Sequence, residues 1–324
     1  MTPGCRGASG QTVAGEAYVL VGPTASGKTA AAEWIARHGG YGILSADSML
    51  VYRGMDIGTA KPAEAERAAV PHWGLDLVAV GEPFSVALYL EAARKAVAEC
   101  RHLGLRLIVV GGTGLYVRAL TEGLEAGPPP DPEARRHWEQ VARDGGVAAL
   151  RAALERLDPA ALDGLSDSAN PRRLIRALER AGAGLPAALP PGRVGVERPL
   201  LAGLACSREE LAARILARAR CMFAKGVLEE TARLRAQGLE QAPTAAQAIG
   251  YAEALACLRG DSSMVEAIER TAARTRQLAK RQMTWFRHQA RVEWIEAGAG
   301  VSVEETGQRV LEAWGRSGPA PLRM

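Results

Sequence analysis

The chain has 324 residues, 48% of them apolar, with a formal net charge of +4 and an isoelectric point near 8.9. These values indicate an ordinary globular protein of about two structural units, and the small positive excess allows an anionic partner without requiring one. No apolar stretch approaches the roughly 18 residues of a membrane span and no signal-peptide pattern opens the chain, so we exclude a membrane protein and expect a cytoplasmic one. The five cysteines are far apart and form no C-x-x-C pair, which argues against a zinc site.

The first third of the chain predicts a tail and then a parallel α/β sheet. Residues 1–16 are rich in Gly, Ala, Ser and Thr, a composition typical of a disordered tail. Three apolar runs predict buried strands: Tyr18–Val21, Tyr41–Leu44 and Leu105–Val110. Helical patterns cover Thr29–Arg37 and Ser85–Cys100. Because each strand ends in glycine or polar residues, and ligands of open parallel sheets bind beyond the carboxyl ends of the strands, we expect these ends to face one site.

The remainder of the chain predicts a helical insertion and a return to the sheet. Prolines in Gly127–Pro132 interrupt the core, and the Arg-, Ala- and Leu-rich residues up to Leu178 have helical spacing. Pro199–Leu204 predicts a returning strand, and Ser207–Arg316 is mainly helical apart from Val292–Ile295. We therefore expect a core over 17–130, an inserted helical subdomain over 131–197, core and C-terminal helices over 198–316, and a tail over 317–324.

Eight residues after the first strand match the phosphate-binding pattern G-x-x-x-x-G-K-[ST]: Gly22, Pro23, Thr24, Ala25, Ser26, Gly27, Lys28 and Thr29. Its glycines let backbone amides turn toward phosphate oxygens, and the next helix presents the positive end of its dipole. Lys28 would add a point charge, and Thr29 would bind Mg²⁺. A glycine-rich turn that happens to contain a lysine is the plain alternative, but it does not explain the flanking strand and helix.

The acidic strand end that assists Mg²⁺ in ATP-using relatives of this loop is missing. The best strand for that role, Leu107–Val110, ends in Gly-Gly-Thr. Asp47 is the one carboxylate well placed at a neighbouring strand end, and it lies between serines rather than after an apolar run. This pattern favours a phosphate-bearing substrate whose chemistry uses the carboxylate for another purpose.

Several segments between Ala17 and Ile295 resemble, in order and spacing, the tRNA dimethylallyltransferases, also called tRNA isopentenyltransferases. They are Gly22–Thr29, Ser45–Ser48, Val51–Pro62, Gly111–Tyr116, Asn170–Arg173, Arg176–Glu179, Ala248–Tyr251, Thr275–Gln282 and Thr284–Arg287. The resemblance implies a P-loop NTPase-like parallel sheet with a helical insertion. It also implies transfer of a dimethylallyl group from dimethylallyl diphosphate to N6 of an adenine beside the anticodon, position 37 of a tRNA. The phosphate loop would then hold this donor instead of ATP, with diphosphate as leaving group.

We expect Asp47 to be the general base, because the N6 amine is a poor nucleophile whose attack is helped when a carboxylate takes its proton. Lys28, the loop amides and Mg²⁺ on Thr29 would stabilise the departing diphosphate. The resemblance adds Thr113 near the reacting amine and Arg218 on the diphosphate. A turn or helix-cap role, common for Asp beside Ser, is the structural alternative for Asp47.

Recognition of tRNA requires a surface that grips RNA and draws the adenine out of its stack. The stretch from Arg270 to Arg291 is rich in Arg and Lys without one Asp or Glu, which favours phosphate contact over a plain solvated face. We expect Trp285 and Phe286 to pack in the core. With the residues that the resemblance implies, the predicted tRNA-binding set is Asp47, Ser48, Met49, Leu50, His72, Thr113, Arg135, Arg172, Arg173, Arg176, Gln247, Gly250, Lys280, Arg281 and Arg287.

Two positions depart from the family pattern: Leu50 stands where many members have Gln, and Trp73 follows His72. The chain has no C-terminal Cys/His zinc module, and we expect a monomer with Mg²⁺ as cofactor. Two other functions stay open. A small-molecule or nucleotide kinase would use the loop for ATP, and a nucleotide-gated RNA-binding module would lack catalysis.

Overall fold

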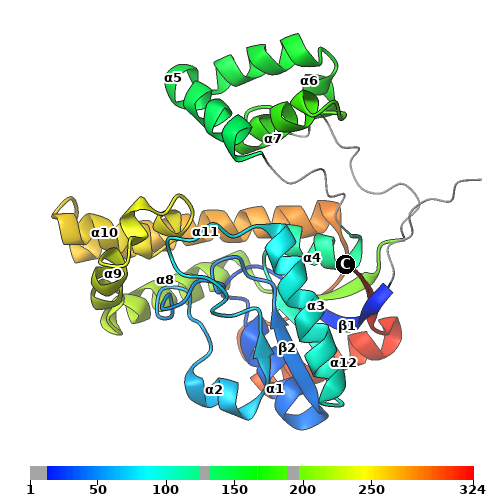
Figure 1. Ribbon diagram of the computed structural model, residues 1–324. Coiled ribbons are helices and arrows are strands. Elements are labelled where there is room, and N and C mark those ends of the chain that lie inside the picture. Colours follow the sequence, from blue (N-terminus) through cyan, green and yellow to red (C-terminus); the bar gives the residue numbers. More distant parts are fainter. Residues whose placement is uncertain (1–12, 124–130, 166, 188–196) are drawn as a thin grey trace, which may run out of the picture. The chain divides into compact units, whose positions relative to one another are not determined.

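A computed structural model describes residues 13–123, 131–165, 167–187 and 197–324 (Figure 1). The chain forms two compact units, the first within residues 1–123 and 198–324 and the second within 124–197. No helix among the described residues is long and apolar enough to cross a membrane.

The first unit is built on a sheet whose strands β3, β2, β4, β1, β5 and β6 are parallel and follow one another in that order. Their bounds are Val13–Val21 for β1, Tyr41–Ser45 for β2, His72–Trp73 for β3, Arg106–Gly111 for β4, Leu200–Ala205 for β5 and Arg291–Glu296 for β6. The expected α/β class with a parallel sheet is therefore confirmed. Val21 lies opposite Gly111, and Ser45 lies opposite Val110, so β1, β2 and β4 end together at one edge.

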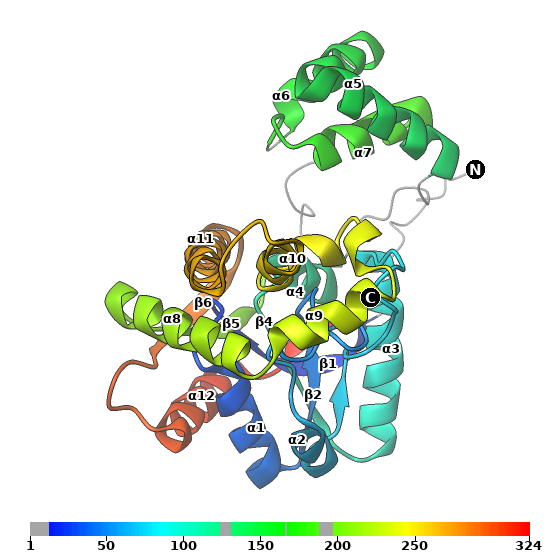
Figure 2. The same ribbon diagram turned by 90° about the vertical axis from the view of Figure 1, so that its left-hand side faces the viewer.

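Helices cover the sheet on both faces, which explains why its strands read as nearly continuous apolar runs. On one face Leu20, Ile43 and Ile108 pack against α1 (Lys28–Gly39) and α12 (Val303–Ser317). These two helices lie side by side (Figure 2). The other face carries α3 (Val86–His102) and α4 (Gly114–Thr121), whose Tyr89 and Tyr116 rings stack with centroids 4.0 Å apart. Tyr89 also donates a 2.9 Å hydrogen bond to the Ser45 carbonyl at the end of β2.

Four further helices gather on one side of the sheet: α8 (Arg208–Ala224), α9 (Val227–Arg235), α10 (Tyr251–Arg259) and α11 (Met264–Gln289) (Figure 1). They share an apolar core with the segment that follows β2, since Tyr52 and Met55 pack among residues of α8, α9 and α10. Glu230 of α9 is buried and accepts hydrogen bonds from the Ile57 amide at 2.9 Å and the Tyr251 hydroxyl at 2.5 Å. This carboxylate therefore ties the segment after β2 to the helices.

The second unit is a small helical bundle of α5 (Pro132–Leu157), α6 (Ala161–Gly164) and α7 (Pro171–Gly182). Leu150 and Leu154 of α5 pack against Leu174 and Leu178 of α7. Proline at the first position of α5 and α7, after an Asp or Asn cap, explains where these helices begin.

Most predicted elements are confirmed, but both predicted chain ends were wrong where the structure describes them. Of the tail predicted over 1–16, residues 1–12 lie outside the described part, and Val13–Glu16 belongs to β1. The tail predicted over 317–324 contains strand β7 (Ala320–Arg323), antiparallel to the first half of β1, with Ala17 opposite Ala320. Pairing between segments about 300 residues apart leaves no trace in local composition. Strand β3 and helix α2 (Glu64–Ala69) were also not predicted.

The close approach of β4 to the loop after β2 generates a first prediction. A Cβ atom at Gly111 would lie 2.2 Å from the Ala46 carbonyl oxygen. We expect Gly111→Ala to lower the free energy of unfolding by about 1–3 kcal/mol, because the two backbones must separate. Urea denaturation measures this difference. Gly81→Ala is the matched control, since a Cβ there meets nothing within 4 Å. Equal midpoints for the two variants would contradict the argument.

Candidate active site

The glycine-rich loop between β1 and α1 curls back on itself because several of its residues have positive φ. Gly22, Ala25 and Gly27 have φ of 143°, 64° and 92°. A Cβ at Gly22 would also lie 2.6 Å from the Leu204 carbonyl oxygen, so the loop passes close to β5. No side chain caps the first turn of α1, which leaves its amides available to an anion.

Lys28 is the buried charge of this loop. Its Nζ donates a 2.6 Å hydrogen bond to the Pro23 carbonyl, and 9% of the residue is exposed. Burial lowers the pKa of Lys28 to about 8, the nearby Asp47 carboxylate opposes this shift, and the Arg218 guanidinium adds to it. The ammonium group is therefore charged at neutral pH, but the Asp47 carboxylate does not fully compensate the cost of burying this charge.

The loops after β2 and β4 are joined by hydrogen bonds. The Thr113 amide donates to the Ala46 carbonyl at 3.1 Å, and the Ser48 amide donates to the Thr113 hydroxyl at 3.1 Å. Asp47 Oδ1 accepts from the Met49 amide at 2.9 Å. Asp47 thus caps a turn, as the alternative to the general-base role predicted. This hydrogen bond uses only one of its two carboxylate oxygens.

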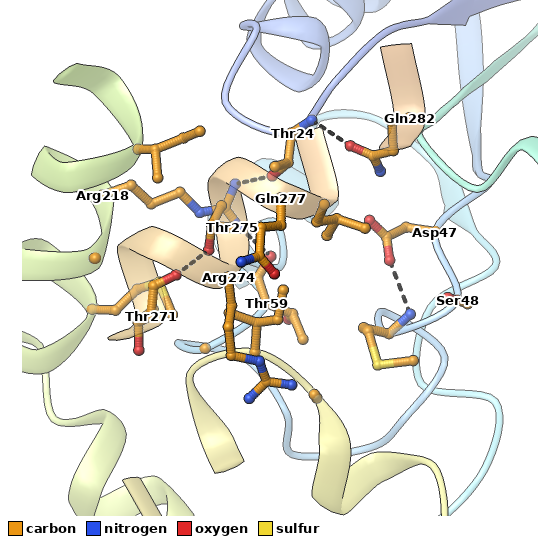
Figure 3. A pocket seen from close by; sticks show the side chains of 18 of the residues that line it. Thr24, Asp47, Ser48, Thr59, Arg218, Thr271, Arg274, Thr275, Gln277 and Gln282 are labelled. Atoms are coloured by element: carbon orange, nitrogen blue, oxygen red, sulfur yellow. Dashed lines mark hydrogen bonds between the residues drawn. The ribbon is translucent and has the colours of Figure 1, made fainter. Parts of the chain in front are cut away.

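Arg218 reaches the loop from α8. It donates to the Thr59 carbonyl at 2.8 Å and to the Thr24 hydroxyl at 3.4 Å (Figure 3). Burial lowers the pKa of Arg218, whereas the Asp47 carboxylate raises it. The buried Lys28 and the half-buried Arg218 therefore lie within electrostatic reach of one carboxylate.

Two cavities meet at these groups. The loop cavity, of about 390 Å³, is lined by residues that include Lys28, Thr29 and Leu50. The helix cavity, of about 400 Å³, extends between α8 and α11 to Gln247 and Arg281 (Figure 3). Both are lined by Thr24, Asp47, Thr59, Arg218 and Gln282. Among the described residues that line either cavity, Asp47 is the only acid.

The loop cavity has the chemistry expected of a magnesium site that a phosphate completes. Thr29 lines it and is exposed. Magnesium usually keeps several waters and takes one or two protein oxygens together with substrate phosphates. The Thr29 hydroxyl is one protein oxygen of the kind that such a site uses, so the residues present fit Mg²⁺ together with a phosphate ligand.

The predicted RNA-binding residues divide into three groups by position. The helix cavity is lined by Asp47, Ser48, Met49, Thr113, Gln247 and Arg281. Lys280 and Arg287 are exposed on α11 outside both cavities. Arg135, Arg172, Arg173 and Arg176 lie in the second unit. There Arg135 and Arg176 pair with the buried Glu179 at 3.6 and 3.0 Å.

Three other predicted RNA-binding residues, Leu50, His72 and Gly250, do not line the helix cavity. Leu50 and His72 line the loop cavity rather than the helix cavity. His72 donates from Nδ1 to the Val70 carbonyl at 2.7 Å, and burial lowers its pKa. Gly250 precedes α10 with φ of 96° and lines neither cavity. A Cβ there would lie 2.8 Å from the Met222 side chain.

The aromatic residues behave largely as expected. Phe286 is buried, and Trp285 packs so closely on Gly114 that a Cβ there would lie 2.3 Å from its ring. Trp73, one of the departures from the family pattern, donates to Glu99 at 2.6 Å, and its ring packs on Gly42. This departure is therefore accommodated at the sheet edge.

Sequence reasoning missed Thr59 and Gln282, and it included Arg274 only within the basic stretch from Arg270 to Arg291. Arg274 lines the helix cavity, pairs with the buried Glu253 and donates to the Gln247 carbonyl at 2.9 Å. Gln282 hydrogen-bonds to the phosphate loop, 258 residues earlier in the chain. Within a basic helix an amide has the pattern of a surface residue, so no local signal could have identified it.

Comparison with known proteins gives consistent matches over most of the chain. A family model described as IPP transferase matches residues 50–289, and one described as isopentenyl transferase matches residues 15–72. A tRNA dimethylallyltransferase of Anaeromyxobacter dehalogenans is 46% identical over 86% of this chain and 93% of its own length. That of Kocuria rhizophila is 42% identical over 86% and 88%.

Solved structures agree with these sequence matches. A full-length tRNA isopentenylpyrophosphate transferase from Bacillus halodurans has 34% identity and a TM-score of 0.68, with 93% of this chain and 96% of that one covered. A eukaryotic dimethylallyltransferase acting on tRNA has 22% identity and a TM-score of 0.69, covering 93% and 76%, and shares the fold.

The lowered pKa of Lys28 predicts how anion binding depends on pH. Below about pH 7 Lys28 is protonated, and as pH rises through 8 the free protein loses this charge. The quantity to follow is the affinity of the wild type for inorganic diphosphate divided by the affinity of the Lys28→Met variant at the same pH. We expect this ratio to be constant below about pH 7. Above pH 8 the ratio should fall by up to about tenfold per pH unit. Titration calorimetry measures both affinities, and the division cancels the ionisation of the ligand. A ratio that stays level to pH 9.5 would refute the role of the charge.

Proposed function

Since this chain belongs to the tRNA dimethylallyltransferase family, we propose that it transfers the dimethylallyl group of dimethylallyl diphosphate to N6 of an adenine beside the anticodon, position 37 of a tRNA. The observation that carries the proposal is that the loop cavity and the helix cavity meet at Asp47 and Arg218. A reaction between two substrates requires such a meeting point.

The donor diphosphate would lie in the loop cavity. Positive φ at Ala25 and Gly27 and the uncapped start of α1 support binding of an anion there. Lys28 and Arg218 supply the positive charge, and the burial of Lys28 and partial burial of Arg218 reduce its screening by solvent. The kinase alternative would also need a phosphate site and an acceptor cavity, but the apolar run Leu107–Val110 ends in Gly-Gly-Thr rather than in the acid that assists Mg²⁺ in ATP-using relatives of this loop.

The adenine would enter the helix cavity after leaving the stack of the anticodon loop. Its N6 would approach Asp47 and Thr113, which lie where the loops after β2 and β4 are hydrogen-bonded together. The alternative of an RNA-binding module without catalysis gives no role to a carboxylate at the boundary of the two cavities.

The reaction forms one bond and breaks one. The N6 lone pair attacks C1 of the dimethylallyl group, a C–N bond forms, and the C1–O bond to diphosphate breaks. Asp47 accepts the proton from N6, a contribution of about 10²- to 10⁴-fold for a positioned base. The electron pair of the broken bond goes to the diphosphate, where Lys28, Arg218 and the loop amides stabilise it.

Thr29 would hold Mg²⁺ together with the diphosphate oxygens. When bound, the ion supplies further positive charge to the leaving group. The Thr29 hydroxyl lies in the loop cavity on the same turn of α1 as Lys28, so both would act on the same phosphate group.

The RNA would be held by cations on both units. On α11 these are Lys280, Arg281 and Arg287, in a stretch without acids. On the second unit they are Arg172 and Arg173 at the start of α7. Arg135 and Arg176 form ion pairs with Glu179, so we expect each to contribute less to RNA binding.

One experiment separates the candidate functions. The protein is mixed with Mg²⁺, labelled dimethylallyl diphosphate and bulk tRNA, and ATP hydrolysis is measured in parallel. Label in the RNA supports the transferase. ATP turnover without labelled RNA would support a kinase, and tRNA binding with neither product would support the non-catalytic module.

Asp47→Asn tests the general base. Asn keeps an oxygen that can accept from the Met49 amide, so the turn is preserved while the basic carboxylate is lost. We expect dimethylallyl diphosphate to bind no more weakly than to the wild type, and a single-turnover rate lower by about 10²- to 10⁴-fold. Rapid-quench measurement with saturating substrates checks the rate. A rate close to that of the wild type would end the assignment.

Lys280→Ala tests the RNA surface. Each lost phosphate contact should reduce the slope of log affinity against log salt concentration by about 0.7–0.9. Filter binding of a tRNA between low and moderate salt measures the slope. Lys95, exposed on α3 and outside both cavities, is the control, and Lys95→Ala should leave the slope unchanged. The same slope for both variants would remove Lys280 from the surface.

A further inference from the structure

The side chain of Gln282 bridges two loops of the active site. Its Oε1 accepts a 2.8 Å hydrogen bond from the Thr24 amide in the phosphate loop (Figure 3). Its Nε2 donates a 3.1 Å hydrogen bond to the Gly112 carbonyl, directly before Thr113. One amide thus fixes the distance between the loop that would hold the donor and the loop that carries Thr113.

The packing around this amide is tight. A Cβ at Gly112 would lie 2.3 Å from Gln282 Nε2 and 3.3 Å from the Gly22 carbonyl oxygen. A side chain at this position would displace the Gln282 amide from the Gly112 carbonyl, so glycine lets the bridge form. A small shift of α11 would therefore be transmitted to both loops rather than absorbed by empty space.

Two helices hold Thr24 through side-chain hydrogen bonds. Its amide is bound by Gln282 of α11, and its hydroxyl accepts from Arg218 of α8. These helices pack together through small side chains, Ala219 of α8 and Ala272 and Ala279 of α11. The first turn of the phosphate loop consequently follows the position of α11.

The same helix faces the acceptor side. Gln277, Leu278 and Arg281 line the helix cavity, while Gln282 lines both cavities. Arg281 directly precedes Gln282, so an RNA phosphate or base that contacts Arg281 would restrict the position of α11 next to the Gln282 side chain. Neighbouring residues of a helix move together, because its backbone hydrogen bonds hold them in one rigid element.

We propose that Gln282 is a positioning residue that couples RNA binding on α11 to the geometry of the phosphate loop. The inference rests on the proposed function, since it takes tRNA and a diphosphate as the two ligands. RNA that restricts the position of α11 also restricts Thr24 and Gly112 through the Gln282 side-chain amide, so the diphosphate binds to a preorganised loop. Because such coupling is reciprocal, a bound diphosphate strengthens RNA binding by the same factor.

The test uses inorganic diphosphate as probe, because it cannot react with the RNA. Its Kd is measured by calorimetry with and without a saturating anticodon stem-loop RNA that has adenine at position 37. For the wild type we expect RNA to lower the Kd by a factor between about 5 and 150, the usual range of coupling between sites. Gln282→Met has a side chain of similar length that makes neither hydrogen bond. It should bring the factor close to one while the Kd of each ligand alone stays near the wild-type value.

The matched control is Gln289→Met, at the end of the same helix and outside both cavities, which should keep the wild-type factor. A second readout separates positioning from loss of structure. Misplaced loops should lower kcat by about 10²-fold, and the lost coupling should raise the KM for dimethylallyl diphosphate at saturating tRNA by up to the wild-type coupling factor. If Gln282→Met does not fold, Gln282→Asn replaces it. Asn keeps the amide on a stem one methylene shorter, so it cannot reach both partners, and the same loss of coupling is expected.

Two results would overturn the inference: a wild-type factor of one, or an undiminished factor in the Gln282 variant. The proposed function fails separately, when wild-type protein transfers no label from dimethylallyl diphosphate to tRNA whatever the coupling factor.

Discussion

The common ending of β1, β2 and β4 is the constraint on which the site depends. Their parallel register sets Val21 opposite Gly111 and Ser45 opposite Val110, so three loops leave the sheet at the same level. Hydrogen bonds from the Ala46 amide to the Val110 carbonyl and from the Thr113 amide to the Ala46 carbonyl then join two of these loops. Lys28, Asp47 and Thr113 are neighbours only because their strands stop together.

The loops at the edge of the sheet carry Lys28, Asp47 and Thr113, but helices far along the chain supply the walls of the two cavities. Arg218 comes from α8, and Gln282 comes from α11. The segment after β2 is held against these helices by Glu230, which accepts hydrogen bonds from the Ile57 and Gly58 amides. That attachment keeps the Thr59 carbonyl where Arg218 donates to it. Hydrogen bonds therefore connect the segments that line the site, although these segments are distant in sequence.

The elements that could be predicted from the sequence are those whose signal is local. The apolar runs ending in Gly22, Ser45 and Gly111, and the helices between them, follow from periodicity and glycine placement. The pairing of β7 with β1 and the bridge made by Gln282 could not be predicted, since each joins segments that only the fold brings together. The role of His72 was assigned by resemblance, and its position on β3 and in the loop cavity follows from the fold alone, so its contact with tRNA stays a prediction.

The charges at the junction of the two cavities explain how one carboxylate can serve both substrates. Desolvation lowers the pKa values of Lys28 and Arg218 and the Asp47 carboxylate raises them, so this carboxylate stabilises the charged form of both. A diphosphate in the loop cavity competes with Asp47 for these cations. In the proposed reaction Asp47 becomes neutral when it takes the N6 proton, at the stage when negative charge grows on the departing diphosphate. Its protonation frees Lys28 and Arg218 to interact with the leaving group alone, so proton transfer at one cavity strengthens charge stabilisation in the other.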